Sequence, residues 1–169
     1  MIPSVDKLIS EARELAGKDV LTAMSLANSL AAQYPDEPKV WSLRAHMHAR
    51  SGSYAEAISD WTRAIELNSS RPSTNPMLAL DLLLNRGADK FALGENESAI
   101  VDFTEALHLC DQYSTDDYRE TLRFWRAEAL LKLGKRRQAL LDLANVRDNF
   151  QFWTYKLRTK AELVADCNK

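Results

Sequence analysis

The most constraining feature of this sequence is one pattern of residues repeated without gaps at 44–67, 86–109 and 126–149. Each copy begins with an arginine and continues with a glycine, an alanine and an aspartate at fixed separations. These positions are Arg44, Gly52, Ala57 and Asp60; Arg86, Gly94, Ala99 and Asp102; and Arg126, Gly134, Ala139 and Asp142. The copies begin 42 and 40 residues apart, a period typical of stacked supersecondary units.

The glycine divides each copy into two helical patterns, because glycine can adopt the left-handed conformation that ends a helix. After the glycine of the first copy, Ala57, Trp61 and Ala64 follow the i, i+4, i+7 spacing of a buried helix face. Only 5 Gly and 5 Pro in 169 residues argue against an all-β chain. The sequence therefore predicts an all-α fold, an α-solenoid of stacked antiparallel helical hairpins.

The arginine and aspartate of each copy, 16 residues apart, can meet across the two helices of a hairpin. These charges either contact a ligand or form an ion pair that holds the helices together. The ion pair is favoured, because each aspartate directly precedes a large apolar residue and each arginine directly precedes a small packing residue. Removing one partner of a buried pair costs about 3–5 kcal/mol, against about 0–1 kcal/mol for an exposed pair.

The middle copy reads Asn85-Arg86-Gly87, then Leu93-Gly94, then AIVDFTEALHL from Ala99 to Leu109. These motifs resemble the N-R-G, L-G and A-I-x-D-aromatic-x-x-A-[IL]-x-L variant of the tetratricopeptide repeat. The resemblance covers about 110 residues in three copies. It implies a superhelix of the tetratricopeptide-repeat (TPR) type.

We expect a single domain over residues 1–169. Its expected units are a degenerate leading repeat at 1–36, full repeats at 37–70, 77–112 and 115–149, and a C-terminal capping helix at 150–169. The leading repeat retains Gly17, Ala23 and Ala27 but lacks the Arg–Asp pair, and we interpret it as incomplete. Terminal repeats are commonly atypical because one side of them faces solvent.

The resemblance also implies a place for a ligand, because in TPR proteins the first helices of successive hairpins line a concave groove. Positions counted from each arginine form one stripe at helical spacing, which includes Lys39 and Asp81. The residues expected to line the groove are Ser42, His46, Arg50, Leu84, Ala88, Phe91, Phe124, Glu128, Leu131 and Lys132. The alternative is that the insertions between copies rotate these helices or that the C-terminal helix fills the groove.

Chaperone-binding members of the family hold a terminal carboxylate with an asparagine two residues after the repeat arginine. Here those positions are His46, Ala88 and Glu128, which disfavours that mode of recognition. A second patch is formed by Phe152, Trp153 and Tyr155, which either cap the last hairpin or form an exposed partner-binding surface.

Charge and composition disfavour several classes of partner and location. The net charge of −2 supplies no field that attracts nucleic acid or an anionic membrane. No apolar run approaches the roughly 18 residues of a membrane span, and charged residues interrupt residues 1–19, so no signal peptide is predicted. The two cysteines, Cys110 and Cys167, have no CxxC spacing, and a cytoplasmic location is expected.

No pattern of catalytic or metal-binding residues is present in the sequence. His46 and His48 are two residues apart and lie on different faces of a helix, so no metal site is predicted. Phosphate-loop, HExxH and GxSxG motifs are lacking. Arg119, Arg123 and Arg126 form a stripe that either binds phosphate or is a solvated, ion-paired surface, and the interspersed acids favour the second.

The sequence thus predicts no enzyme, no cofactor and no metal. We expect a noncatalytic interaction module, an adaptor that binds a peptide or a partner helix of another protein in the groove. The alternative is a dedicated chaperone or an immunity-type inhibitor that sequesters one specific protein. The sequence does not indicate an oligomeric state.

Overall fold

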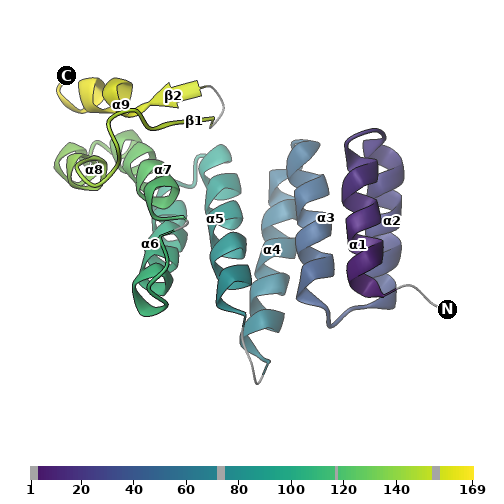
Figure 1. The fold of residues 1–169 in the computed structure, drawn as a ribbon. Helices are drawn as coiled ribbons and strands as arrows, with labels where there is room; N and C mark the ends of the chain where they lie inside the picture. Colours follow the sequence, from purple (N-terminus) through teal and green to yellow (C-terminus); the bar gives the residue numbers. More distant parts are fainter. Residues whose placement is uncertain (1–3, 72–74, 117, 154–156) are drawn as a thin grey trace. The chain divides into compact units, whose positions relative to one another are not determined.

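A computed structural model describes residues 4–71, 75–116, 118–153 and 157–169 (Figure 1). Helices predominate, and a two-stranded sheet lies near the C-terminus. In chain order the elements are α1 (Val5–Ala16), α2 (Val20–Gln33), α3 (Pro38–Arg50), α4 (Tyr54–Ser69), α5 (Pro76–Ala92), α6 (Asn96–Gln112), α7 (Arg119–Lys132), α8 (Arg136–Leu143), β1 (Gln151–Trp153), β2 (Leu157–Thr159) and α9 (Lys160–Cys167). None of these helices is both long and apolar enough to cross a lipid bilayer.

The repeated glycines lie in the turns after α3, α5 and α7. Gly52, Gly94 and Gly134 have φ angles of 78°, 80° and 71°, in the region that residues with a Cβ atom rarely adopt. Each ends the first helix of a copy and allows the second to begin within a few residues. The predicted division of every copy into two helices is therefore confirmed.

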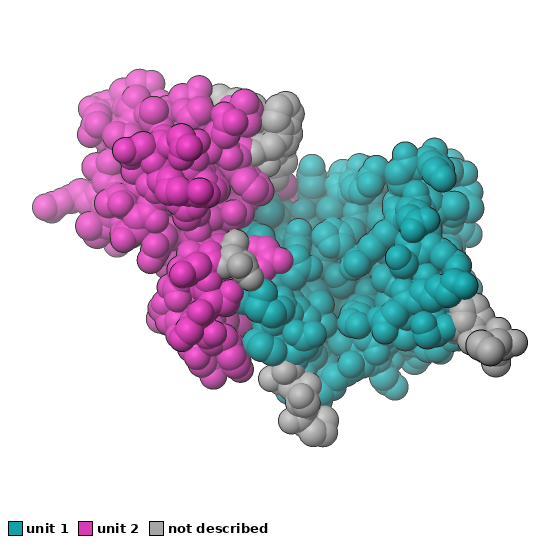
Figure 2. Space-filling model, viewed as in Figure 1, with its two compact units in different colours: residues 1–89 teal, residues 90–169 magenta. Residues whose placement is uncertain are grey.

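The chain divides into two compact units, residues 1–89 and residues 90–169 (Figure 2). The boundary falls inside α5, so residues 76–89 of this helix belong to the first unit. The prediction that residues 1–169 form one domain stays a prediction.

In the first unit, α1 packs against α2, α2 against α3, and α3 against both α1 and α4 (Figure 1). Trp61 is fully buried among Ala45, Ala57, Ala64 and Leu82. The small residues let the helix backbones approach, and the indole fills the remaining space. The sequence predicted this alternation of small and large residues in the second helix of the copy.

The described residues 4–36 contain two helices, α1 and α2, which corrects the expectation of an incomplete leading repeat. The side chain of Ser4 accepts a hydrogen bond from the Lys7 N–H, and Asp19 accepts from the N–H groups of Leu21 and Thr22. These caps begin α1 and α2. The first helix was missed because it carries no repeat arginine, although its buried face, Ile9, Ala12 and Ala16, packs in the same core as α2.

Asp89 is a buried carboxyl group in the first unit that accepts a hydrogen bond of 2.7 Å from Trp61 Nε1. Burial raises the pKa of Asp89 to about 6, and the bond from Trp61 opposes this rise. Between about pH 4 and pH 6 the folded protein therefore binds more protons than the unfolded protein, so stability falls as the pH rises through this window.

We expect Asp89→Asn to stabilise the protein by about 1–2 kcal/mol at pH 7.5, because the amide oxygen still accepts from Trp61 and no charge is buried. The gain should shrink as the pH falls to 4, where the carboxyl is almost fully protonated in the folded protein and about half protonated in the unfolded protein. Urea unfolding of wild type and variant at both pH values measures the difference. An equal gain at both pH values would contradict this assignment.

In the second unit, α6 packs against α7, α7 against α8, and α9 against both α7 and α8. Phe103 and Phe124 are fully buried, and Trp125 stacks on Phe103 with ring centroids 6.1 Å apart. Phe124 shares its core with Leu143 of α8 and Leu163 of α9. The last repeat thus closes its core with residues from the C-terminal segment.

The expected single helix over 150–169 is wrong for residues 151–153 and 157–159. Gln151–Trp153 and Leu157–Thr159 form an antiparallel pair in which Gln151 lies opposite Thr159. Phe152 is half-buried whereas Gln151 is exposed, because successive side chains of a strand point to opposite faces. Thr159 forms a capping box with Glu162, so the helix begins only at Lys160.

Candidate protein-binding surface

The predicted Arg–Asp contact is present in the first copy. Arg44 donates from Nε to Asp60 Oδ2 at 2.7 Å and from Nη2 to Asp60 Oδ1 at 2.6 Å. His48, four residues after the arginine, lies 3.9 Å from the same carboxylate, and the Arg44 guanidinium lies 4.6 Å from the centre of the Trp41 ring. Such a two-point contact joins α3 to α4, as the ion-pair interpretation predicts.

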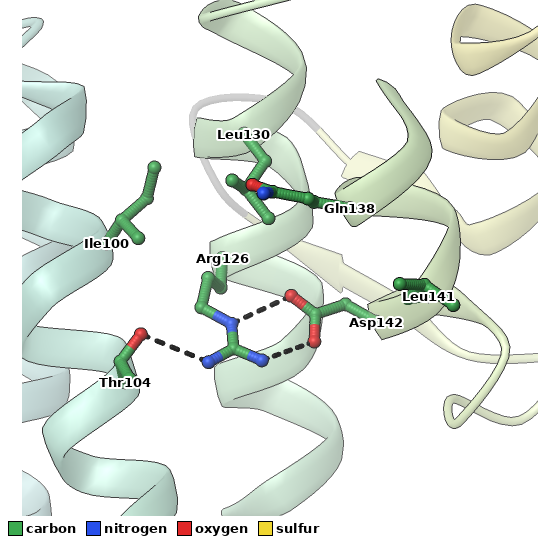
Figure 3. Close-up of a pocket in the computed structure, with 7 residues that line it drawn as sticks. All are labelled: Ile100, Thr104, Arg126, Leu130, Gln138, Leu141 and Asp142. Carbon is green, nitrogen blue, oxygen red and sulfur yellow. Dashed lines mark hydrogen bonds and ion pairs between the residues drawn. The ribbon is translucent and has the colours of Figure 1, made fainter. Parts of the chain in front are cut away.

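The third copy has the same contact between α7 and α8 (Figure 3). Arg126 donates from Nε and Nη2 to the two oxygens of Asp142, at 2.8 and 2.5 Å. Its Nη1 donates to Thr104 Oγ1 on α6 at 3.0 Å. The guanidinium therefore links the helices of its own hairpin and also holds the preceding helix.

The arginine and aspartate of the second copy belong to different compact units, and the prediction that they pair stays a prediction. Within the first unit, Arg86 Nη1 donates to Thr62 Oγ1 at 3.2 Å. Within the second unit, Lys90 Nζ lies 2.9 Å from Asp102 Oδ2. Arg86 and Arg126 thus both contact a threonine two residues after the aspartate of the preceding copy.

The first-helix positions of the first unit border a hollow that we name the first-helix cavity. It has a volume of about 360 Å³. Its lining residues come from α1, α3 and the beginning of α5: Asp6, Ile9, Ser10, Arg13, Lys39, Asn75, Leu78 and Asp81. Lys39 and Asp81 are the stripe positions that the sequence placed on the groove wall. Ile9 and Leu78 supply apolar surface, and Lys39 pairs with Asp6 at 2.8 Å.

The groove residues expected in the first unit differ in their exposure. Ser42 is buried, and its Oγ has no hydrogen-bond partner among the described residues. Leu84 and Ala88 are half-buried, and Arg50 is exposed. His46 is half-buried and meets the Trp61 ring edge-on, with centroids 4.7 Å apart. None of these five residues lines the first-helix cavity itself.

His46 responds to charges on three helices of the first unit. Burial lowers the pKa of His46 below 6.5; the charge of Asp81 raises it, and the charges of Arg13 and Arg50 lower it. The imidazole is therefore mostly neutral at pH 7.

In the second unit, the expectation of an open apolar groove over Phe91 and Phe124 is wrong. Phe124 is fully buried, with its ring centroid 5.3 Å from that of Phe150. Phe91 is buried against Trp125, with centroids 5.4 Å apart. The C-terminal segment covers this part of α7, which corresponds to the alternative in which that segment fills the groove.

Glu128 is also buried, and its Oε1 lies 3.6 Å from Arg158 Nε on β2. Leu131 and Lys132 remain accessible beside it. With Glu128, Arg158 and Asp166 they line a hollow of about 350 Å³. Arg158 also pairs with Asp166 at 2.8 Å, so this hollow is lined mainly by charged groups that already neutralise one another.

The second predicted patch is only partly described by the structure. Phe152 packs at 6.2 Å from Trp125 and at 6.3 Å from Phe150, the kind of contact expected of a cap. The backbone of Trp153 pairs with that of Leu157. The Trp153 side chain and Tyr155 lie outside the described residues, so a partner-binding role for them stays a prediction.

A further hollow, of about 300 Å³, lies over the Arg126–Asp142 pair (Figure 3). Ile100 of α6 and Leu141 of α8 flank it. In the neighbouring hollow, Arg119 pairs with Asp111 and Asp116, and Arg123 donates to the Asn145 carbonyl at 3.3 Å. The arginine stripe of α7 is thus largely paired, in agreement with the interpretation of an ion-paired surface.

Comparison with solved structures shows the fold. The chain is similar to YrrB, a TPR protein with an unusual peptide-binding site, with a TM-score of 0.64 and 17% identity over 81% of this chain. It is also similar to BtubC (BKLC) from P. vanneervenii, with a TM-score of 0.57 and 18% identity over 82% of this chain. The chain spans 64% and 51% of the lengths of these two proteins.

The predicted all-α fold of successive TPR-like hairpins is therefore confirmed. No protein-family model and no curated protein sequence matches the chain.

Proposed function

We propose that this protein is a noncatalytic interaction module that binds a peptide or a segment of another protein in the first-helix cavity. The observation that carries the proposal is the position of this cavity. It opens on the first helices of successive hairpins, and Lys39 and Asp81 lie on its wall, as the repeat register predicts. The TPR fold and the peptide-binding site of YrrB are consistent with such a role.

The chemistry of the cavity suits a polypeptide segment. Ile9 and Leu78 offer apolar surface for one side chain of the ligand, while Arg13, Lys39 and Asp81 surround it with charged groups that can orient a backbone. The helices on either side are held by packed cores and by the Arg44–Asp60 contact. A wall that is already ordered loses little conformational entropy when a ligand binds.

A peptide-binding experiment tests this proposal. Dodecapeptides are selected from a random library on the wild-type protein, and the Kd of the best binder is measured by fluorescence anisotropy. We expect Leu78→Glu to weaken binding at least tenfold, because a charge replaces the apolar contact, which corresponds to about 1.4 kcal/mol or more. Ser10→Tyr, at an exposed position of the lining, should weaken it to a similar extent by filling the cavity.

Leu21→Glu is the matched control, because Leu21 is 83% exposed on α2 and lines none of the described hollows. Thermal melts of all variants establish that they are folded. The proposal is wrong if no peptide is selected, or if the Kd of the selected peptide is the same for wild type, Leu78→Glu and Ser10→Tyr.

A further inference from the structure

Two guanidinium groups that have no partner among the described residues lie near His46 in the first unit. Arg13 belongs to α1 and Arg50 to the end of α3, and both side chains are exposed. Among the described residues neither has a hydrogen bond or an ion pair, whereas Arg44 and Arg71 of the same unit are paired with carboxylates.

The Lys39–Asp6 contact of 2.8 Å sets the register of α3 against α1, and His46 and Arg13 each lie seven residues further along these two packed helices. Arg50 follows His46 by about one helical turn on α3, so both arginines lie at the level of this ring or one turn beyond it. The charges of both arginines also lower the pKa of His46.

The acidic side chains near His46 do not neutralise the positive charges of Arg13 and Arg50. Asp6 is held by Lys39 at 2.8 Å. Asp81 raises the pKa of His46 and accepts a hydrogen bond of 3.2 Å from Asn85 Nδ2. Two guanidinium groups therefore face one carboxylate around a neutral imidazole, giving this place a local positive charge although the whole chain carries −2. Like charges held close together are relieved when an anion binds between them.

We propose that the ligand of the first-helix cavity is an acidic peptide. An aspartate or glutamate side chain binds at Arg13 and Arg50 beside the His46 ring, and a neighbouring aliphatic side chain enters the cavity over Ile9 and Leu78. This inference rests on the proposed function and specifies its ligand.

A peptide carboxylate fits these residues better than a nucleic-acid phosphate. Guanidinium groups bind carboxylates through two parallel hydrogen bonds, and Arg13 lies on the wall of a cavity that Ile9 and Leu78 also line. A peptide can place an aliphatic side chain against Ile9 and Leu78, whereas a sugar-phosphate backbone has none. The acidic net charge of the chain also opposes binding of a polyanion.

The same arrangement makes binding depend on pH. Burial and the two arginines hold the pKa of His46 below 6.5 in the free protein. A bound carboxylate adds a negative charge beside the ring, so it raises the pKa of His46 and the complex takes up a proton. The affinity should therefore increase as the pH falls. Asp81 on α5 is the acid whose charge raises the pKa of His46.

The test begins with the peptides selected on the wild-type protein from the random dodecapeptide library. We expect them to carry Asp or Glu within a few residues of Leu, Ile or Val. Replacing that acid with its amide should raise Kd at least tenfold. Arg13→Ala and Arg50→Ala should each raise Kd about fivefold or more, because each removes one of the two cations, whereas Arg63→Ala, at an exposed arginine of α4, should leave Kd unchanged.

For the wild type, Kd should fall about threefold or more between pH 7.5 and pH 6, and His46→Gln should abolish this dependence. The inference is overturned, and the proposed function kept, if the selected peptides lack acids and their binding is lost in Leu78→Glu but retained in Arg13→Ala. If no peptide is selected, both are wrong. Tighter binding of a fluorescein-labelled oligouridine than of any peptide, lost in Arg13→Ala, would overturn the inference in favour of nucleic acid.

Discussion

Replacing Arg126 with alanine is expected to lower the free energy of unfolding by about 3–5 kcal/mol. The guanidinium makes two hydrogen bonds to Asp142, which is buried, and one to Thr104 on the preceding helix. Without the Arg126 guanidinium, the Asp142 carboxylate stays buried but has lost its paired cation. The free-energy cost of removing this carboxylate from water is then no longer offset. Urea unfolding followed by far-UV circular dichroism measures the change.

A double-mutant cycle separates this contact from the loss of packing. Asp142→Ala should be about as destabilising as Arg126→Ala, and the double variant should be less destabilised than the sum of the two single variants. Arg63→Ala removes an exposed pair with Glu66 and should change stability by about 0–1 kcal/mol. Additive effects of Arg126→Ala and Asp142→Ala, each within the range of the exposed control, would show that the pair does not hold the hairpin.

The second large effect is expected from Phe124→Ala, which should destabilise the protein by about 3–5 kcal/mol. Its ring is fully buried against Phe150 and shares a core with Leu163 and Cys167 of α9. Truncation leaves a cavity between α7 and the C-terminal segment, because helices fixed by other contacts cannot fully close around it. Thermal and urea unfolding measure the loss.

Leu141→Ala is the control for this substitution, because Leu141 is 70% exposed on α8 and its truncation creates no enclosed space. It should change stability by about 0.5 kcal/mol or less. A Phe124→Ala protein that is as stable as the wild type but has lost peptide binding would restore Phe124 to an open groove. It would also contradict the packing of the C-terminal segment on α7.

The repeat made most of the fold predictable from the sequence. Gly52, Gly94 and Gly134 mark turns that require a positive φ, so the helix boundaries around them follow from backbone sterics alone. The Arg–Asp spacing predicted a contact that two copies contain, Arg44 with Asp60 and Arg126 with Asp142. These features depend on residues close in sequence, where the geometry of one hairpin determines which side chains meet.

The candidate site was less predictable, because it depends on what covers each helix. The stripe positions were placed on one surface as if all copies were equivalent, yet Lys39 borders a cavity while Phe124 is buried under the chain's own C-terminal segment. Nothing in the spacing around Phe124 differs from the other copies. The C-terminal segment that covers Phe124 was also predicted wrongly, as one helix. The sequence around Phe150 and Phe152 is compatible with a short strand as well as with a helix.

The position of Arg13 and the contacts of Thr62 and Thr104 were not predicted from the sequence, for different reasons. Arg13 lies on a helix without the repeat motif, so no register connected it with His46 or Arg50. Thr62 and Thr104 each follow the repeat aspartate by two residues and accept from the next arginine, a correlation visible in the sequence. The third copy has Ala144 at this position.

The most direct test of the central claim, that the first-helix cavity binds peptide, is a titration of ¹⁵N-labelled protein with a selected dodecapeptide, followed by amide chemical-shift changes. The account predicts that the largest changes map to Ser10, Arg13, Lys39 and Asp81, on α1, α3 and α5, with small changes on α2 and α4. Changes centred on α2 and α4, or on residues 90–169, would contradict it.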